Sequence, residues 1–241
     1  MRLSDFDVLS FDCYGTLIDW ESGIVAALAP WLEAHGVDAD RERILAAFAR
    51  AEAPQQQATP GMLYRDLLAV VHGTIAEQFG LPQDAAAARA FGASVEHWPA
   101  FPDSPTALAY LKQHYQLVIL SNVDRASFLH SNRRLGVAFD AVYTAEDVGS
   151  YKPDPRNFEH LLASLGERGI ERARILHTAE SLFHDHLPAQ RCGLATCWIH
   201  RRAGQDGFGA TRAPEGEVRP PDFRFESLAA MAEAHRAEQS G

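Results

Sequence analysis

Short apolar runs recur along much of the chain, and stretches with helical periodicity separate them. The first run is VLSFD at 8–12, and the others, rich in β-branched or aromatic residues, are 115–121, 140–145, 174–179, 194–200 and 222–225. Helix-like stretches lie between most of these runs, at 104–113, 125–135, 155–166 and 184–192. Strands that alternate with helices predict an α/β fold with a parallel sheet, and runs this continuously apolar indicate that helices cover both of its faces.

Residues 20–97 follow a different pattern. They hold helix-like segments rich in Ala, Leu and Glu, with no convincing strand, at 22–35, 40–53, 61–79 and 83–97. We therefore expect a smaller helical domain at 20–97, inserted into a core formed by 1–19 and 98–241. The remaining segments are interpreted as a proline-rich return linker at 98–105, a long surface loop at 203–221 and a frayed tail after about residue 235.

The composition narrows the classes of protein that fit. Of the 241 residues 46% are hydrophobic and 22% are charged, as in globular proteins, and no apolar run approaches the ~20 residues that span a bilayer. The N-terminus carries acids where a signal peptide would carry bases, so we expect a cytoplasmic protein with no membrane partner. The net charge of −10 argues against a nucleic-acid partner but leaves room for a small anionic substrate in a local pocket. The three cysteines form no zinc pattern.

The string FDCYGTLIDW at 11–20 carries the most chemical information. Asp12 closes the first predicted strand, at the carboxyl edge where α/β sheets bind ligands. Gly15 allows a sharp turn, and Thr16 offers a hydroxyl that can orient the carboxylate. Taken alone, the string is equally consistent with an aspartate that only caps the following turn.

Three further polar motifs follow predicted strands or precede predicted helices. Ser121 and Asn122 end the second strand, and Lys152 lies in GSYKPDPR, before a proline that starts a helix. The string HTAESLFHD at 177–185 brings Glu180 and Asp185 to the end of another strand. Each motif is weak alone, but their common place at strand ends makes a shared site the better interpretation.

Together these motifs resemble the four motifs of the haloacid dehalogenase-like superfamily, in the same order and over nearly the full chain. The resemblance implies a Rossmann-like core with an inserted helical cap, for which 20–97 has the right place and composition. It implies that Asp12 is the nucleophile of a covalent ester mechanism and that Ser121 and Asn122 bind the anionic or leaving group. It also implies that Lys152 balances the negative charge of the pocket and keeps Asp12 ionised.

The residue two positions after the nucleophile separates branches of this superfamily. Phosphatases carry a second Asp there as general acid, whereas this chain has Tyr14, which is no comparable proton donor near pH 7. The D-x-Y-G-T pattern, YKPD and TCWI resemble the L-2-haloacid dehalogenases, whose halide leaves without protonation. The resemblance therefore implies hydrolysis of a small 2-haloalkanoic acid to a 2-hydroxy acid, with no cofactor and with a homodimer as the expected assembly.

The chain departs from that branch in its last two motifs. Glu180, Leu182 and His184 stand where the dehalogenases carry Ser, Asn and an aromatic residue, and Phe158 replaces a Tyr. Asp185 alone matches, which implies that it orients Lys152 or the hydrolytic water.

These departures leave several alternatives open. Asp12, Glu180 and Asp185 could together hold Mg²⁺, as in a phosphatase acting on a small phosphorylated metabolite. Hydrolysis of another small carboxylic acid, or a binding scaffold without catalysis, is also consistent with the sequence. The halide acceptor expected from the cap is Arg50, with Arg41 and Arg65 as rivals, and the candidates for an apolar wall are Trp20, Tyr64, Trp98 and Phe101.

Overall fold

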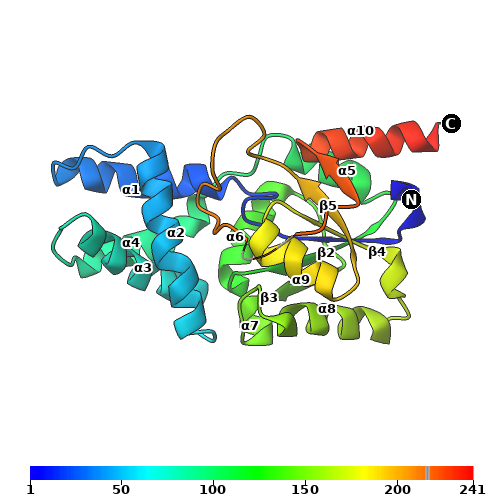
Figure 1. Cartoon of the computed structure of the whole chain (residues 1–241), viewed down its shortest axis with the longest axis horizontal. Coiled ribbons are helices and arrows are strands. Elements are labelled where there is room, and N and C mark those ends of the chain that lie inside the picture. The colour runs from blue at the N-terminus through cyan, green and yellow to red at the C-terminus, as the bar shows by residue number, and fades with distance from the viewer. Residues whose placement is uncertain (215, 217, 241) are drawn as a thin grey trace.

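The computed structural model describes residues 1–214, 216 and 218–240 and contains one parallel sheet (Figure 1). Its strands lie in the order β3-β2-β1-β4-β5-β6 and pair in parallel throughout. Their bounds are β1 (Val8–Phe11), β2 (Gln116–Ser121), β3 (Ala141–Thr144), β4 (Ile175–Ala179), β5 (Ala195–Ile199) and β6 (Phe223–Phe225). All six fall within the predicted runs, so the α/β prediction is confirmed.

Two groups of helices surround or extend this sheet. The helices that follow β1 directly are α1 (Trp20–Ala34), α2 (Arg41–Ala58), α3 (Tyr64–Gln78) and α4 (Ala85–Ala93), continued by a 3-10 turn η2 (Ser94–His97). The core helices are α5 (Ser104–Leu111), α6 (Arg125–Leu135), α7 (Ala145–Val148), α8 (Pro155–Glu167), α9 (Leu187–Arg191) and α10 (Leu228–Gln239). Short 3-10 turns lie at Leu3–Asp5 and Arg172–Arg174, and a π-helical turn at Leu182–His186 precedes α9.

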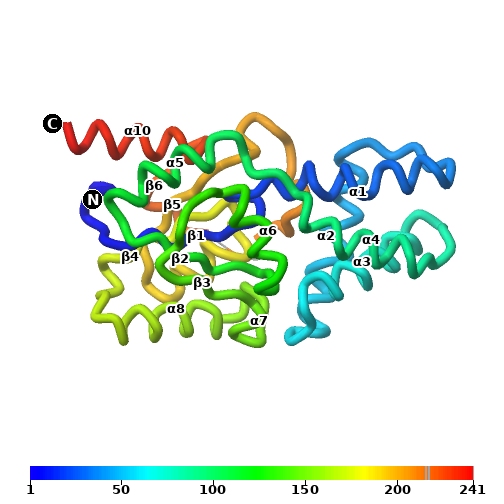
Figure 2. Tube along the Cα trace, turned by 180° about the vertical axis from the view of Figure 1, so that it is seen from behind, coloured from blue at the N-terminus to red at the C-terminus, as the bar shows by residue number. Residues whose placement is uncertain are grey.

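Alternating side chains of the strands build the two faces of the core. Leu9 and Phe11 of β1 belong to a buried cluster with residues of α5 and α10, whereas Val8 packs with residues of α8 and α9. This alternation with a period of two is what a pleated strand imposes when helices cover both faces. Figures 1 and 2 show α5 and α10 on one side of the sheet and α8 on the other.

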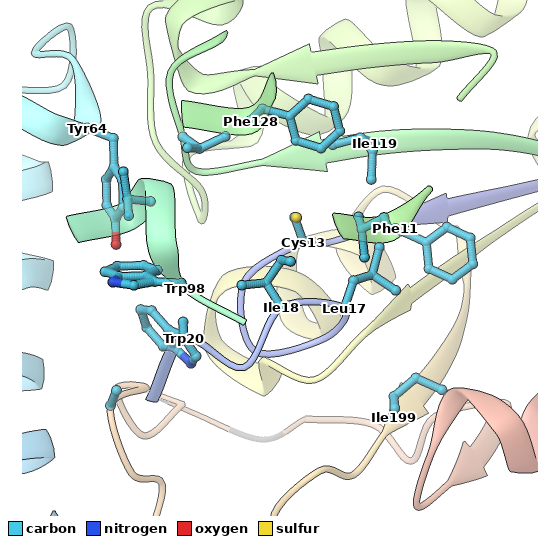
Figure 3. Close-up of a cluster of buried hydrophobic side chains, with 14 of the residues drawn as sticks. Phe11, Cys13, Leu17, Ile18, Trp20, Tyr64, Trp98, Ile119, Phe128 and Ile199 are labelled. Atoms are coloured by element: carbon cyan, nitrogen blue, oxygen red, sulfur yellow. The ribbon is translucent and has the colours of Figure 1, made fainter. Parts of the chain in front are cut away.

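Helices α1 to α4 and η2, here called the cap, lie beyond one end of the sheet (Figure 1). Aspartates begin three of these helices: Asp19, Asp40 and Asp84 each accept a hydrogen bond from a backbone N–H of the first turn. One hydrophobic cluster runs from Ile119 and Phe11 of the sheet to Trp98 and Tyr64 of the cap side, as Figure 3 shows. The fold class with an inserted cap is confirmed, while the domain limits at 19/20 and 97/98 stay a prediction.

The C-terminal part differs from the sequence-based expectation. The predicted frayed tail is wrong, because α10 continues to Gln239 and the Glu238 carboxylate accepts hydrogen bonds from the backbone N–H groups of Leu3 and Ser4 at 3.0 and 2.9 Å. Within 203–221 the described residues form no helix or strand, as expected. Ala210 and Thr211 are nevertheless buried, so this loop is not confined to the surface.

No helix among residues 1–214, 216 and 218–240 is long and apolar enough to cross a membrane. The cytoplasmic location stays a prediction.

We predict that Gly23→Ala destabilises the protein although alanine is the better helix former. A Cβ at Gly23 in α1 would lie 2.3 Å from the ring of Trp98, so the cap and the return linker would have to separate. Overpacking of this kind costs about 1–3 kcal/mol, more than the ~1 kcal/mol that helix propensity returns. The free energy of unfolding in urea measures the loss.

The matched control is Gly166→Ala in α8, where no atom lies within 4 Å of the added Cβ. Here we expect a gain of up to about 1 kcal/mol. Equal effects of the two substitutions would contradict the assigned contact with Trp98.

Candidate active site

Asp12 lies where the connections of the sheet change direction. The chain runs from β1 outward to β2 and β3, then returns to place β4 on the other side of β1. Crevices that bind ligands in α/β proteins lie outside the carboxyl ends of the strands at such a reversal. Asp12 follows the last residue of β1, and Ser121 ends the neighbouring β2. The topology therefore brings the first two sequence motifs to one edge.

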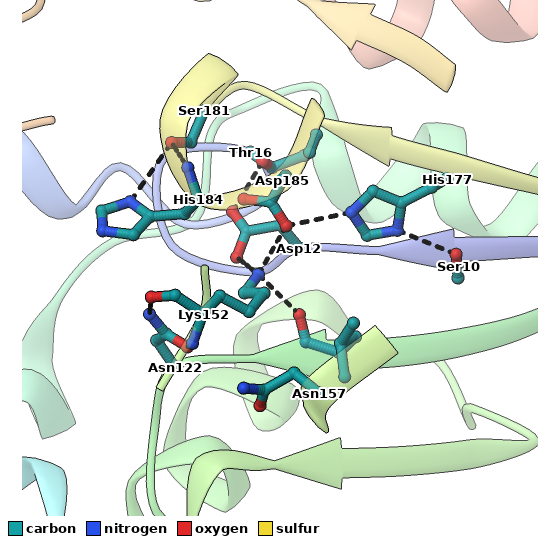
Figure 4. A network of polar contacts seen from close by, with 12 residues as sticks. Ser10, Asp12, Thr16, Asn122, Lys152, Asn157, His177, Ser181, His184 and Asp185 are labelled. Carbon is teal, nitrogen blue, oxygen red and sulfur yellow. Dashed lines mark hydrogen bonds and ion pairs between the residues drawn. The ribbon is translucent and has the colours of Figure 1, made fainter. Parts of the chain in front are cut away.

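The turn after β1 holds the Asp12 carboxylate in place. Gly15 adopts a φ of +91°, a conformation that L side chains rarely adopt, and its N–H donates to the carbonyl of Ile18 at 2.8 Å. The Thr16 hydroxyl donates to Asp12 Oδ2 at 2.8 Å and accepts from the backbone N–H of Glu180 at 2.9 Å. The hydroxyl thus links β1 to the end of β4 (Figure 4).

Lys152 joins the nucleophile to the last motif. Its Nζ donates to Asp12 Oδ1 at 2.9 Å, to Asp185 Oδ1 at 2.6 Å and to the carbonyl of Leu120 at 2.8 Å. An ammonium group has three protons, so these contacts use all of them. The side chain is 1% exposed, and it therefore sits as a fixed buried cation between two carboxylates.

Three further side chains support this triad. His177 Nε2 lies 2.9 Å from Asp185 Oδ1, and its Nδ1 lies 2.9 Å from the Ser10 hydroxyl. The Asn122 amide donates to the Lys152 carbonyl at 2.9 Å and accepts from the Lys152 N–H at 2.6 Å. Asn122 therefore positions the lysine with one of its two amide protons, and its expected contact with the substrate stays a prediction. His177 and Ser10 lie inside apolar strands, and no sequence pattern indicates a role for them.

Burial and charge act against each other in the triad. Burial alone would lower the pKa of Lys152, but Asp12 and Asp185 outweigh it and raise that pKa above its ordinary value. For Asp185 burial works in the raising direction, but Lys152 and His177 outweigh it and hold the pKa well below the usual range. Burial raises the pKa of Asp12, while the ammonium of Lys152 and the hydroxyl of Thr16 favour its ionised form.

A cavity of about 30 Å³ lies between this triad and the cap. Core and cap residues both line it: Asp12, Tyr14, Trp20, Glu52, Tyr64, Ser121, Asn122, Lys152, Ser181, His184, Asp185 and Thr211. The Ser121 hydroxyl is buried there without a hydrogen-bond partner among the described residues. A free donor beside the nucleophile suits an anionic group of a ligand.

Tyr14 lines the cavity of Asp12, but its hydroxyl is engaged elsewhere. The hydroxyl oxygen lies 2.8 Å from the Ser131 Oγ of α6, and burial raises the pKa of Tyr14 well above its ordinary value. Of the four predicted wall aromatics, Trp20 and Tyr64 line the cavity. Trp98 packs behind Tyr14 with ring centres 5.5 Å apart, and Phe101 lines a neighbouring cavity instead.

The predicted cap arginine is not brought to this cavity. Arg50 is exposed on α2, where its guanidinium donates twice to Gln78 Oε1 at 3.1 and 2.9 Å. Arg50 thus does not line the cavity in this structure, and the halide-acceptor role expected of it stays a prediction. Arg41 pairs with Glu21 at 3.3 Å and Arg65 with Asp66 at 3.8 Å, and neither lines the cavity.

Glu180 also lies outside the cavity of Asp12, and its expected substrate contact stays a prediction. Its side chain lines the neighbouring cavity with Glu21, Arg41, Arg201 and Arg202, and burial raises its pKa to about 8. Asp12 and Asp185 meanwhile both direct an oxygen to Lys152 Nζ. Among the described residues no three His, Cys, Asp or Glu side chains are arranged to hold a metal ion. Asp12, Glu180 and Asp185 thus do not fit the shared magnesium site that the sequence left open.

Sequence reasoning missed Glu52, Ser181 and Thr211 among the lining residues. A signal for Glu52 exists, because Leu45, Phe48 and Glu52 follow helical spacing along the buried face of α2. No comparable signal marks Thr211, which a loop without regular structure brings to the site.

We predict that Asp185→Asn lowers the free energy of unfolding by about 3 kcal/mol at pH 7, because it removes one partner of a buried ion pair. The pKa of Asp185 is depressed in the folded state, so its contribution is present above the unfolded pKa near 4 and is lost as pH falls below it. The difference between the two proteins should therefore shrink below about pH 4. Urea titrations from pH 3 to pH 8 measure it.

The control is Asp38→Asn in the exposed loop between α1 and α2, which should change stability by less than about 0.5 kcal/mol at any of these pH values. A constant difference for Asp185→Asn down to pH 3 would argue against the depressed pKa.

Comparison with known proteins places this geometry in a family. A model of haloacid dehalogenase-like hydrolases matches residues 6–178. (S)-2-haloacid dehalogenase H-109 of Pseudomonas putida is 32% identical over 149 residues, which are 59% of this chain and 63% of that protein. The pyrimidine 5'-nucleotidase YjjG of Escherichia coli is 33% identical over 75 residues, which are 30% of this chain and 32% of that protein. The matched region thus spans less than two thirds of either relative.

The fold is also similar to that of solved structures. The defluorinating L-2-haloacid dehalogenase Rha0230 superposes with a TM-score of 0.76 at 23% identity, over 98% of this chain and 99% of that one. A likeness at this identity supports the fold, and the family match covers Asp12, Ser121 and Lys152. The chain belongs to the haloacid dehalogenase-like hydrolases.

Proposed function

We propose that the protein is a 2-haloacid dehalogenase that converts a small 2-haloalkanoic acid into a 2-hydroxy acid through an ester on Asp12. The observation that carries this proposal is the buried Asp12–Lys152–Asp185 triad, with Tyr14 instead of an acid two residues after the nucleophile. The similarity to proteins named (S)-2-haloacid dehalogenase supports it.

The reaction needs two displacements. A carboxylate oxygen of Asp12 attacks C2 of the substrate, a C–O bond forms, and the C–halogen bond breaks with its electron pair leaving as halide. Water then attacks the carbonyl carbon of the resulting ester, which releases the 2-hydroxy acid and restores Asp12. Water and haloacid are thereby converted into hydroxy acid, halide and one proton.

The residues around Asp12 favour halide over an alcohol as leaving group. An alkoxide needs a proton as it departs, and the Tyr14 hydroxyl is engaged with Ser131 and has a raised pKa. Halide needs none. Lys152 favours the ionised form of the nucleophile and Thr16 orients it. The free Ser121 hydroxyl is the donor that we assign to the anionic group or the departing halide.

The cavity holds about two water molecules, so a haloacid can enter only when the cap moves away from the core. We therefore propose a short-chain substrate that is enclosed by the cap during reaction. No nucleic-acid partner, no metal cofactor and a homodimeric assembly remain parts of this proposal.

We predict halide release from 2-chloropropanoate or chloroacetate that EDTA does not reduce, together with no turnover of p-nitrophenyl phosphate. The reason is that the assigned nucleophile, orienting hydroxyl and cation are all side chains of the protein. Phosphatase turnover abolished by EDTA would replace this proposal with a metal-dependent phosphatase, and inactivity of the folded protein on a broad panel would favour a binding scaffold.

The covalent step has its own readout. After several turnovers in ¹⁸O water the heavy isotope should appear in the peptide that carries Asp12, because water attacks the ester on the aspartate side. Asp12→Asn should abolish both halide release and labelling, since an amide cannot form the same ester. Turnover without label in this peptide would show that Asp12 is not the nucleophile.

We further predict that Arg50→Ala changes kcat/KM for the haloacid by less than about twofold. Its guanidinium bonds Gln78 on the cap surface and does not line the cavity, so its loss should leave substrate contacts intact. Steady-state kinetics measure this, with Lys152→Met as the positive control that should lose activity. A large loss in Arg50→Ala would mean that α2 reorients when substrate binds.

A further inference from the structure

The cap contributes one buried carboxyl group to the cavity of Asp12. Glu52 lies on α2, is 3% exposed and lines the cavity together with Asp12 and Ser121. It comes from the cap, whereas the triad comes from the core. Any substrate enclosed between the two is therefore in reach of both.

The contacts of Glu52 leave one of its oxygens available. Gln56 Nε2 donates to Glu52 Oε1 at 2.6 Å, and the Tyr64 hydroxyl donates to the same oxygen at 3.4 Å. Among the described residues no group bonds Oε2. Glu52 Oε1 already accepts a hydrogen bond from Gln56 Nε2, and an amide nitrogen can only donate. A proton on this carboxyl group therefore belongs on Oε2.

The charges around the cavity show why that proton matters. Lys152 is the only permanently cationic residue among the described lining residues, and all three of its protons are used within the protein. Among these lining residues an anionic substrate therefore meets two aspartates and no cation with an unused proton, and an ionised Glu52 would add a third negative charge.

The groups facing Glu52 do not compensate for its charge. Burial raises the pKa of Glu52 to about 8, and only the hydrogen bond from Tyr64 acts in the lowering direction. Burial also lowers the pKa of His184 to about 4, so this lining residue is neutral at pH 7, as are the phenols of Tyr14, Tyr64 and Tyr151. At pH 7 Glu52 is thus mainly a neutral acid.

We propose that protonated Glu52 is the substrate-binding group of the cap and donates a hydrogen bond from Oε2 to the carboxylate of the substrate. This inference rests on the proposed dehalogenase function, since it assumes a carboxylate next to the reacting carbon. It gives the cap a neutral donor for the substrate carboxylate, a role separate from the halide contact expected of Arg50. The enzyme then binds its anionic substrate only while Glu52 keeps its proton.

The test uses binding of propanoate, which has the substrate carboxylate but no leaving group, so it does not depend on turnover. Calorimetry should show that the wild-type affinity falls about tenfold between pH 7 and pH 9, as the acid loses its proton. Glu52→Gln has an amide donor in place of the acid and does not titrate, so its affinity should be close to that of the wild type at pH 7 and constant up to pH 9.

Glu52→Ala removes the donor and should weaken propanoate binding by about 10–100-fold at pH 7. If haloacids are turned over, the same variant should raise KM more than it lowers kcat. Glu77→Gln, exposed on α3, is the matched control and should behave as the wild type. Thermal denaturation confirms that each variant is folded, and Glu52→Gln carries the test if Glu52→Ala is not.

The outcomes separate the two proposals. Propanoate binding that depends on Glu52 and pH, without halide release from any haloacid, would support the role of Glu52 and overturn the dehalogenase function. Halide release with propanoate binding that is the same at pH 7 and pH 9 in wild type and Glu52→Gln would overturn the role of Glu52. Absence of propanoate binding at pH 7 would overturn it as well.

Discussion

The structure of the site depends on one buried cation held between two carboxylates. Lys152 Nζ contacts Asp12 and Asp185 at 2.9 and 2.6 Å. Asp12 follows β1, whereas Asp185 lies in the π-helical turn after β4, far away in the sequence. Removing ions from water is costly, and only close geometry with all donors used offsets that cost. The supporting contacts from Thr16, Asn122 and His177 provide that geometry. The same arrangement places an aspartate oxygen where it can attack a substrate, so stability and chemistry rely on the same contacts.

The cap gives this charged edge its selectivity. Trp20 and Tyr64 form an apolar cover over the triad, and a cluster of buried side chains continues from the sheet into the cap. Excluding water strengthens each electrostatic interaction in the cavity and favours an attack by a carboxylate that would be weak in solution. Glu52 adds a neutral donor to this cover, which lets an anion approach a site that already carries a net negative charge.

Much of the fold and part of the site could be read from the sequence. Periodicity located all six strands because each is short, apolar and bounded by polar or turn residues. It failed at the C-terminus, where α10 is anchored by contacts between Glu238 and the first residues of the chain, 235 positions away. Local pattern carries no information about such a partner.

Local sequence pattern was enough to predict the alternation of strands and helices, the place of the helical insertion and the polar motifs that contain Asp12, Ser121, Lys152 and Asp185. These follow from local spacing, which the side-chain period of strands and helices imposes. The packing of distant segments was needed to show that Arg50 is exposed, that Glu180 lines a neighbouring cavity and that Glu52 lines the cavity of Asp12. Such assignments depend on how the cap packs on the core, and contacts between segments far apart in sequence set that packing.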